Sequence, residues 1–339
     1  MLDKAWTTTG LKSVCVVILV LAMTGCGQLQ DFPGSKDTVS EGTVKEEATE
    51  ERLQAHRDDA NAWHGDRLER LQTKDGWLTL VGLFWLEEGD NAVGSDAGHP
   101  VVLPSKVAAT VGTVRLTVDA ESGSAEAVFV PDADGGIEVV RQGPATGEIP
   151  LVADTAGDPT LLQSGTVTFY LIERSGRYGI RVKDSASEVR QSFDGVDRFD
   201  VDWHWRVVAD YEPRTEPKFL EMPTAIGIVE KLNSPGTVRF EKDGVSYRLD
   251  AYESHDKEVW FVFGDQTNAK TTYGGGRFLY SQFDEGDTSQ AGKLVVDFNR
   301  AYNPPCVFTA YATCPLATPD NRLATVVEAG EKKWADYAH

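Results

Sequence analysis

The sequence contains few cysteines, only four among 339 residues, and few basic residues relative to its acidic ones. Four cysteines are too few for the disulfide framework of a small secreted scaffold. With 33 lysines and arginines against 53 acidic residues, the formal net charge is −20. A chain this acidic does not attract the phosphates of DNA or RNA, nor a surface of anionic lipids. The composition therefore argues against nucleic acid as a partner.

The sequence also lacks the common signatures of catalysis and cofactor binding. It contains no glycine-rich dinucleotide or phosphate motif, no Gly-x-Ser-x-Gly nucleophile motif and no His-Glu-x-x-His metal motif. These absences exclude only the recognisable forms of such chemistry. We therefore expect no cofactor and no metal, and the question of catalysis stays open.

The apolar run near the N-terminus, Val14–Met23, has ten residues and is too short to cross a bilayer as a helix, which takes about 20. Lys4 and Lys12 precede it and small residues follow it, as in an export signal. The next residues, Met23-Thr24-Gly25-Cys26, resemble a bacterial lipobox, in which the cysteine becomes the lipidated first residue of the mature chain.

The lipobox resemblance implies a signal peptide at 1–25 and a lipid anchor, such as palmitate, on Cys26. Gly27, rather than an aspartate, follows the cysteine, which implies the outer membrane with the protein facing the periplasm. Residues 26–50 are acidic and contain almost no large apolar side chains after Phe32. Such a segment cannot bury enough surface to offset its ordering entropy, so we predict a flexible tether.

An amphipathic helix is predicted at 51–75, where apolar residues recur at helical spacing up to the Asp75-Gly76 turn. His56 and His64 lie about two turns apart on it. With no cysteine or third histidine nearby in sequence, we interpret them as exposed polar residues rather than metal ligands.

Short apolar stretches separated by Gly, Pro and Asp follow the helix. Their spacing of about 8 to 12 residues, with alternating apolar positions, is typical of antiparallel sandwiches and barrels. The clearest hairpin turn is Arg174-Ser175-Gly176-Arg177. The aromatic stretch Phe199–Tyr211 and the Glu212-Pro213-Arg214 break after it indicate a boundary. We predict a mainly β protein with two antiparallel lobes, sandwich-like or barrel-like, at 76–203 and 204–339.

Several motifs stand out along the chain. They are Gly76-Trp77-Leu78, Gly82–Leu86 and Gly94-Ser95, and further on Thr272–Arg277, Asp297–Pro315, Asn321–Leu323 and Glu328–Glu331. Together these motifs resemble those of domain-of-unknown-function family 1684. The family occurs in bacteria and archaea and is uncharacterised, so the resemblance implies no activity. Leu323, Ala324, Val326 and Val327 fit a last strand.

Unusual polar residues are dense in the C-terminal motifs. If they converge, they form a cleft for a small polar ligand such as a sugar or a carboxylate, and Asp297 pairs with Arg277 or faces that ligand as a general base. Glu328 is a second candidate base. The predicted ligand-binding residues are Arg277, Asp297, Asn299, Arg300, Tyr302 and Asn321.

Cys306 and Cys314 remain after Cys15 leaves with the signal and Cys26 takes the lipid. In an oxidising periplasm we expect a disulfide between them. Two reduced structural thiols, or a reactive thiol, are the alternatives. The spacing is not that of a zinc site, and no histidine lies close in sequence.

Three functional hypotheses follow. The leading one is a non-enzymatic envelope lipoprotein that binds a small polar ligand or another envelope component through the C-terminal loop cluster. The second is a hydrolase with Asp297 or Glu328 as general base, although no complete acid–base or nucleophile–base set is visible. The third is a structural β module without a small-molecule site.

Overall fold

The computed structural model describes residues 49–119, 121, 124–255 and 257–334. The predicted signal peptide, the lipid site at Cys26 and the tether up to residue 48 lie outside the described residues. Within the described part, no helix is long and apolar enough to cross a membrane.

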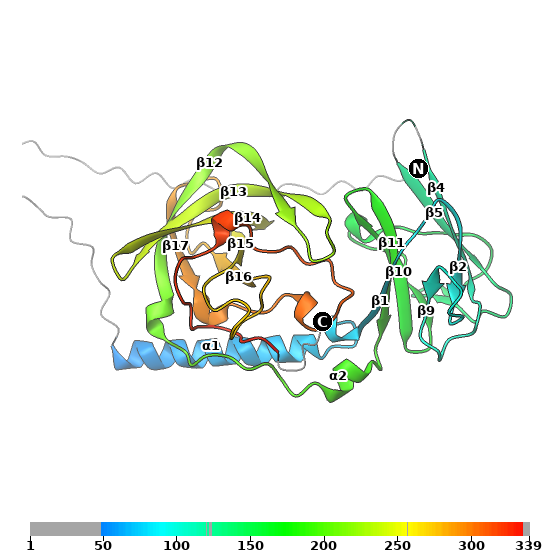
Figure 1. The fold of residues 1–339 in the computed structure, drawn as a ribbon, viewed down its shortest axis with the longest axis horizontal. Helices are drawn as coiled ribbons and strands as arrows, with labels where there is room; N and C mark the ends of the chain where they lie inside the picture. The colour runs from blue at the N-terminus through cyan, green and yellow to red at the C-terminus, as the bar shows by residue number, and fades with distance from the viewer. Residues whose placement is uncertain (1–48, 120, 122–123, 256, 335–339) are drawn as a thin grey trace, which may run out of the picture. The chain divides into compact units, whose positions relative to one another are not determined.

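Helix α1 (Glu50–Leu71) opens the described chain and runs along the second lobe (Figure 1). The Thr49 hydroxyl accepts a hydrogen bond from the Arg52 amide at its start, and acidic residues occupy its first turn. Its buried residues are His56, Ala60, Arg67 and Leu71. The helix therefore packs through polar as well as apolar side chains.

Both helix histidines face the protein, so their interpretation as exposed residues was wrong. His56 is 7% exposed, and only 12% of the His64 side chain is exposed. Burial, followed by the charges of Arg198 and Arg67, lowers the pKa of His64 to about 4, so its ring is neutral at pH 7. The described residues contain no group of three or more potential metal ligands.

The first lobe packs two sheets against each other around a hydrophobic core that includes Phe129 and Phe169. One sheet has the order β1-β11-β10-β9-β6-β7 and the other the order β3-β2-β4-β5-β8. All strand pairs are antiparallel except β2 with β3. The strands are β1 (Leu80–Trp85), β2 (Gly89–Gly94), β3 (Val101–Val102), β4 (Gly112–Val118), β5 (Ala125–Pro131), β6 (Glu138–Val139), β7 (Gly143–Pro144), β8 (Ile149–Pro150), β9 (Leu162–Ser164), β10 (Val167–Arg174) and β11 (Arg177–Asp184).

The predicted hairpin turn between β10 and β11 is confirmed. Ser175 and Gly176 both have positive φ, 48° and 77°, as a two-residue hairpin loop requires. The turn places Arg174 at the end of β10, next to the second lobe. A short helix, α2 (Glu188–Ser192), and a single 3₁₀ turn, η3 (Trp203–Trp205), lead to that lobe.

The second lobe is a six-stranded antiparallel sheet with the order β16-β15-β14-β13-β12-β17, which curls into a nearly closed barrel. The edge strands β16 and β17 approach each other, and Phe278 and Tyr302 exchange two backbone hydrogen bonds of 2.9 Å beside this seam. The strands are β12 (Arg206–Pro223), β13 (Val229–Lys242), β14 (Val245–His255), β15 (Glu258–Phe263), β16 (Arg277–Gln282) and β17 (Gly292–Asp297).

The chain after β17 crosses the second lobe as irregular backbone with the 3₁₀ turns η4 (Phe298–Arg300), η5 (Pro305–Val307) and η6 (Pro319–Asn321). The last strand predicted around Leu323–Val327 is not formed. Side chains occupy the backbone groups that a strand would use: the Arg277 guanidinium donates to the carbonyls of Val327 and Ala329, and Asp265 accepts from the Val327 amide. The fold is therefore mainly β, as predicted, but it ends in a loop held by buried charges.

Candidate functional site

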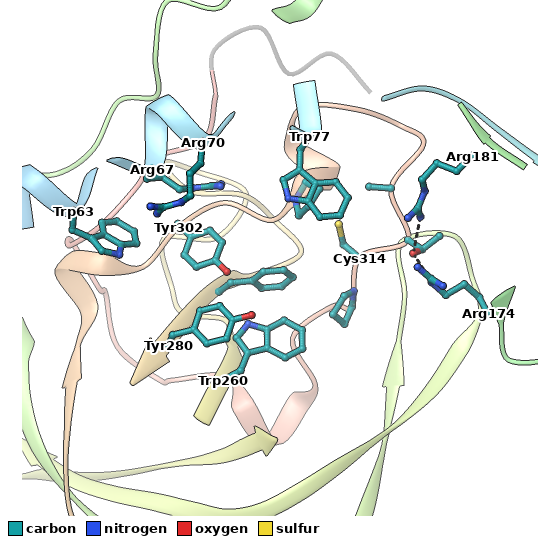
Figure 2. A pocket seen from close by; sticks show the side chains of 15 residues that line it. Trp63, Arg67, Arg70, Trp77, Arg174, Arg181, Trp260, Tyr280, Tyr302 and Cys314 are labelled. Carbon is teal, nitrogen blue, oxygen red and sulfur yellow. Dashed lines mark hydrogen bonds between the residues drawn. The ribbon is translucent and has the colours of Figure 1, made fainter. Parts of the chain in front are cut away.

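A cavity of about 450 Å³, which we call the arginine pocket, lies where α1, the first lobe and the second lobe meet (Figure 2). Four arginines line it, together with a wall of aromatic side chains and part of the C-terminal loop. No Asp or Glu is among the described residues that line it. The lining is Trp63, Arg67, Arg70, Trp77, Arg174, Arg181, Trp260, Phe278, Tyr280, Tyr302, Pro305, Ala312, Thr313, Cys314 and Pro315.

Helix geometry brings three of these residues to the pocket. Trp63, Arg67 and Arg70 are spaced i, i+4 and i+7, so they lie on one face of α1. This face is turned toward the second lobe, where the Trp63 ring lies 6.1 Å from the Tyr302 ring and Arg67 donates to the Asn303 carbonyl. The helix thus supplies one side of the pocket.

Arg67 is held rigidly, whereas Arg70 is exposed. The Arg67 guanidinium donates to the Asn303 carbonyl at 3.0 Å, lies 3.5 Å from a Glu331 carboxylate oxygen and stacks 4.6 Å from the centre of the Tyr302 ring. The Arg70 side chain makes no hydrogen bond or ion pair within the described part of the chain. Arg70 is therefore available to an anion that enters the pocket.

The first lobe contributes Arg174 and Arg181, one from each strand of the β10–β11 hairpin. Arg174 holds Asp154 through two hydrogen bonds of 2.7 and 3.0 Å, and both arginines donate to the Thr313 hydroxyl. Burial lowers the pKa of Arg174, but the hydrogen bond to Asp154 and the negative charges of Asp154 and Glu230 together outweigh burial and raise the pKa. Arg181 is 3% exposed, and its Nε has no hydrogen-bond partner.

The aromatic wall is a row of stacked rings, two from the neighbouring strands β15 and β16 and one from the loop after β17. Trp260 on β15 is paired in register with Tyr280 on β16, and their rings stack at 6.2 Å; Tyr280 in turn stacks on Tyr302 at 6.3 Å. Burial raises the pKa of both tyrosines, so both hydroxyls are neutral at pH 7. The buried Trp260 Nε1 has no hydrogen-bond partner. The wall offers flat apolar faces with a few polar edges.

Arg277, predicted to bind a ligand, is in the core instead. It has no exposed surface and pairs with Asp265 at 2.9 Å, not with Asp297. It also donates to the carbonyls of Ala329 and Val327. Arg277 is a brace for the C-terminal segment and cannot meet a ligand from solvent.

The other predicted ligand-binding residues are divided between the core and the seam of the barrel. Asn321 is fully buried and joins backbone groups of Asp250 and Val262. Asn299 is 2% exposed and bonds the backbone of Asp202. The six residues therefore do not converge on one cleft, although Tyr302 lines the arginine pocket.

A second cavity, the seam pocket, opens beside edge strands β16 and β17 and has a volume of about 440 Å³. Three of the predicted residues, Asp297, Arg300 and Tyr302, line it. Its full lining is Asp59, Trp63, Arg206, Glu258, Tyr280, Ser281, Gln282, Asp284, Val295, Asp297, Arg300 and Tyr302.

Asp297 is committed to a buried hydrogen-bond network rather than exposed as a base. It accepts from His56 Nε2 at 2.8 Å and from the Asn299 side chain at 2.8 Å. Burial raises its pKa, but the hydrogen bonds from His56 and Asn299 and the charge of His56 outweigh burial and lower it overall. Glu328, the other candidate base, is exposed and lines neither of these two pockets.

We expect Asp297→Asn to lower the free energy of unfolding at pH 7 by about 1.5 to 3 kcal/mol, because it removes charge-assisted hydrogen bonds. Because the pKa of Asp297 is lower in the folded state than the unfolded value of 3.8, ionised Asp297 stabilises the fold at pH values above 3.8. This stabilisation is lost as the pH falls through the folded-state pKa. The difference in free energy of unfolding between wild type and Asp297→Asn, measured by urea unfolding, should therefore be smaller at pH 3 than at pH 7. Asp284→Asn, which changes an exposed carboxylate of the same pocket, is the control and should show little effect. A difference in free energy of unfolding that stays constant between pH 7 and pH 3 would contradict this account.

Cys306 and Cys314 form a disulfide, with Cα atoms 6.0 Å apart. Cys314 and the following Pro315 line the arginine pocket. Part of the segment Asp297–Pro315, which the sequence singles out, therefore lines the pocket, through Tyr302, Pro305 and the four residues from 312 to 315. Sequence reasoning missed most of the other walls; the i, i+4, i+7 spacing of Trp63, Arg67 and Arg70 was the available signal.

The fold and the pocket define a mainly β protein of two lobes with a cationic, aromatic-walled cavity where α1 and the two lobes meet. The model of a family described as protein of unknown function (DUF1684) matches residues 191–332. The chain is also 31% identical to an uncharacterised protein of Haloarcula marismortui with a solution NMR structure; the alignment covers 43% of this chain and 80% of that one, with a TM-score of 0.37. The chain belongs to the DUF1684 family.

No curated protein matches the chain. The family match begins at residue 191, so it includes the second lobe but neither α1 nor the first lobe, nor the motifs between Gly76 and Ser95. The arginine pocket combines residues from inside the match, such as Trp260 and Tyr302, with Arg67 and Arg174 from outside it.

Proposed function

We propose that the protein binds a small carboxylate that carries a ring with an apolar face, such as an acidic sugar, in the arginine pocket. The observation that supports this most is the charge of the lining: four arginines and no carboxylate among the described lining residues of a chain whose net charge is −20. A cationic concavity in an acidic protein concentrates anions locally.

The composition of the walls supports a ring-shaped ligand. Small-molecule sites are commonly concave and largely aromatic, with a few polar groups that fix orientation, and their volumes fall in the range of about 300 to 1,000 Å³. The arginine pocket, at about 450 Å³, fits this description. The stacked rings of Trp260, Tyr280 and Tyr302 offer faces for a ring, and Arg70 offers an uncommitted guanidinium for a carboxylate.

Calorimetric titration of the purified protein with glucuronic acid, and with neutral glucose as the matched ligand, tests the proposal. We expect glucuronic acid to bind more tightly, and Arg70→Gln to weaken it about fivefold to tenfold, because a hydrogen bond to a charged group is lost at a partly solvated site. Binding of glucose should not change.

The control is Arg57→Gln, which removes the same charge from an exposed arginine of the same helix that does not line the pocket. It should leave both affinities unchanged. If both substitutions weaken the binding of glucuronic acid equally, the effect is a general one of charge. If glucuronic acid does not bind to the wild-type protein, the proposal is wrong.

We also propose that the protein is a lipoprotein of the cell envelope, anchored to the outer membrane through a lipid on Cys26 and facing the periplasm. The support is in the sequence: a short apolar run, small residues and a lipobox-like Met23-Thr24-Gly25-Cys26. The ligand would then come from the periplasm.

A further inference from the structure

We infer that Thr313 is a specificity-determining residue of the arginine pocket and selects an acidic sugar that carries an N-acyl group. Its hydroxyl donates a hydrogen bond to the carbonyl oxygen of that group. The inference rests on the proposed function, in which Arg70 binds the acid of the same ligand. It adds the second group by which the ligand is recognised and the wall of the pocket that this group meets.

The Thr313 hydroxyl is a donor without an acceptor. Arg174 Nε and Arg181 Nη2 both donate to its oxygen, at 3.2 and 3.3 Å, and dashed lines mark the two bonds in Figure 2. A hydroxyl has two lone pairs and one hydrogen, so these bonds occupy the oxygen and leave the hydrogen to be donated. No group in the described part of the chain accepts it. Because the two guanidinium groups polarise the hydroxyl, it is a strengthened donor for a ligand that enters the pocket.

The wall around this hydroxyl is fixed and offers donors. Thr313 precedes Cys314, which is in the disulfide with Cys306 and whose carbonyl accepts from the Ala225 amide at 2.9 Å. Arg181 lines the same pocket and is 3% exposed, and its Nε has no hydrogen-bond partner. Leaving buried donors unpaired is costly, which favours a ligand that brings an acceptor to this wall.

The acceptor that fits here is neutral. Arg174 is paired with Asp154 at 2.7 Å and lies 3.8 Å from Glu230. Arg181 also approaches Asp154, at 4.0 Å, so two positive charges are balanced by two negative ones. A sugar hydroxyl could accept the bond, but its own hydrogen would then need an acceptor, and neither of these carboxylates lines the pocket. A carbonyl oxygen accepts without that requirement.

The surface beside the hydroxyl suits the rest of an acyl group. Ala312, Cys314 and Pro315, the neighbours of Thr313 in the chain, line the pocket with small apolar side chains. The methyl of an acetamido group can pack on such a surface while its carbonyl meets the hydroxyl. An acetamido group therefore matches both the unused donor and its apolar surroundings.

The test compares glucuronic acid with N-acetylglucosaminuronic acid, which has the same ring and carboxylate and an acetamido group in place of one hydroxyl. Calorimetric titration of the wild-type protein should show the acetamido form binding about threefold to tenfold more tightly, as one added neutral hydrogen bond gives. Thr313→Val, which removes the hydroxyl at nearly the same volume, should abolish this preference. Thr313→Ser keeps the hydroxyl and is the matched control, so it should retain the preference.

Three outcomes are decisive. Equal affinity of the wild-type protein for the two ligands, with both weakened by Arg70→Gln, overturns the role of Thr313 and leaves the proposed function standing. A preference that survives Thr313→Val, or that is lost in Thr313→Ser as well, also overturns this role. If neither ligand binds, the proposed function and this inference are both wrong. A thermal unfolding curve shows that each variant is folded at the temperature of the titration, and Thr313→Ala replaces Thr313→Val if the latter is not.

Discussion

Replacing Arg277 with methionine is expected to lower the free energy of unfolding by about 3 to 5 kcal/mol, since it breaks a buried ion pair from one side. The guanidinium and its partner Asp265 both have side chains without exposed surface. The same guanidinium binds the carbonyls of Val327, Ala329 and Glu331. The substitution therefore leaves a buried carboxylate without its cation and frees the C-terminal segment. Urea unfolding followed by tryptophan fluorescence measures the loss.

The matched control is Arg239→Met, which breaks the exposed pair of Arg239 and Glu212 on strands β12 and β13 of the same lobe. Exposed pairs contribute about 0 to 1 kcal/mol, so the control should change little. Adding Asp265→Asn to Arg277→Met should recover part of the loss, because the unpaired charge is removed. Equal losses in Arg277→Met and Arg239→Met would show that Arg277 is not a brace.

The fold class could be predicted because strand patterns are local. Alternating apolar positions and turn residues such as Ser175-Gly176 report on their own neighbourhood in the chain. The break expected at Glu212-Pro213-Arg214 is instead an irregularity inside β12, which continues to Pro223. An edge or bulged position can accommodate a proline when tertiary pairing supplies the strand on both sides.

The site could be predicted only in part because its residues come from four distant segments. The loop after β17 was recognised from its density of special residues, and Tyr302 does line both cavities. The sequence could not predict which residue each charged side chain pairs with. Asp297 bonds to His56, which is 241 positions away, and Arg277 pairs with Asp265. A buried arginine and an exposed one look the same in a sequence, so the brace was mistaken for a binding residue.

Substitution of Cys26 by serine is expected to move the protein from the membrane fraction to the soluble fraction. If Cys26 carries the proposed acyl chains, losing them removes a very large partition energy, because each acyl CH₂ group buried in a bilayer contributes about 0.8 kcal/mol. Electrostatic attraction to the membrane cannot replace this partition energy, because the chain has a net charge of −20 and is repelled by anionic lipids. Incorporation of labelled palmitate, together with fractionation of the cells, measures both effects. Cys15→Ser is the matched control, because Cys15 lies in the apolar run and would leave with the signal peptide. If the Cys26→Ser protein stays in the membrane fraction, or Cys15→Ser loses the label equally, Cys26 is not the anchor and the periplasmic location of the arginine pocket loses its support.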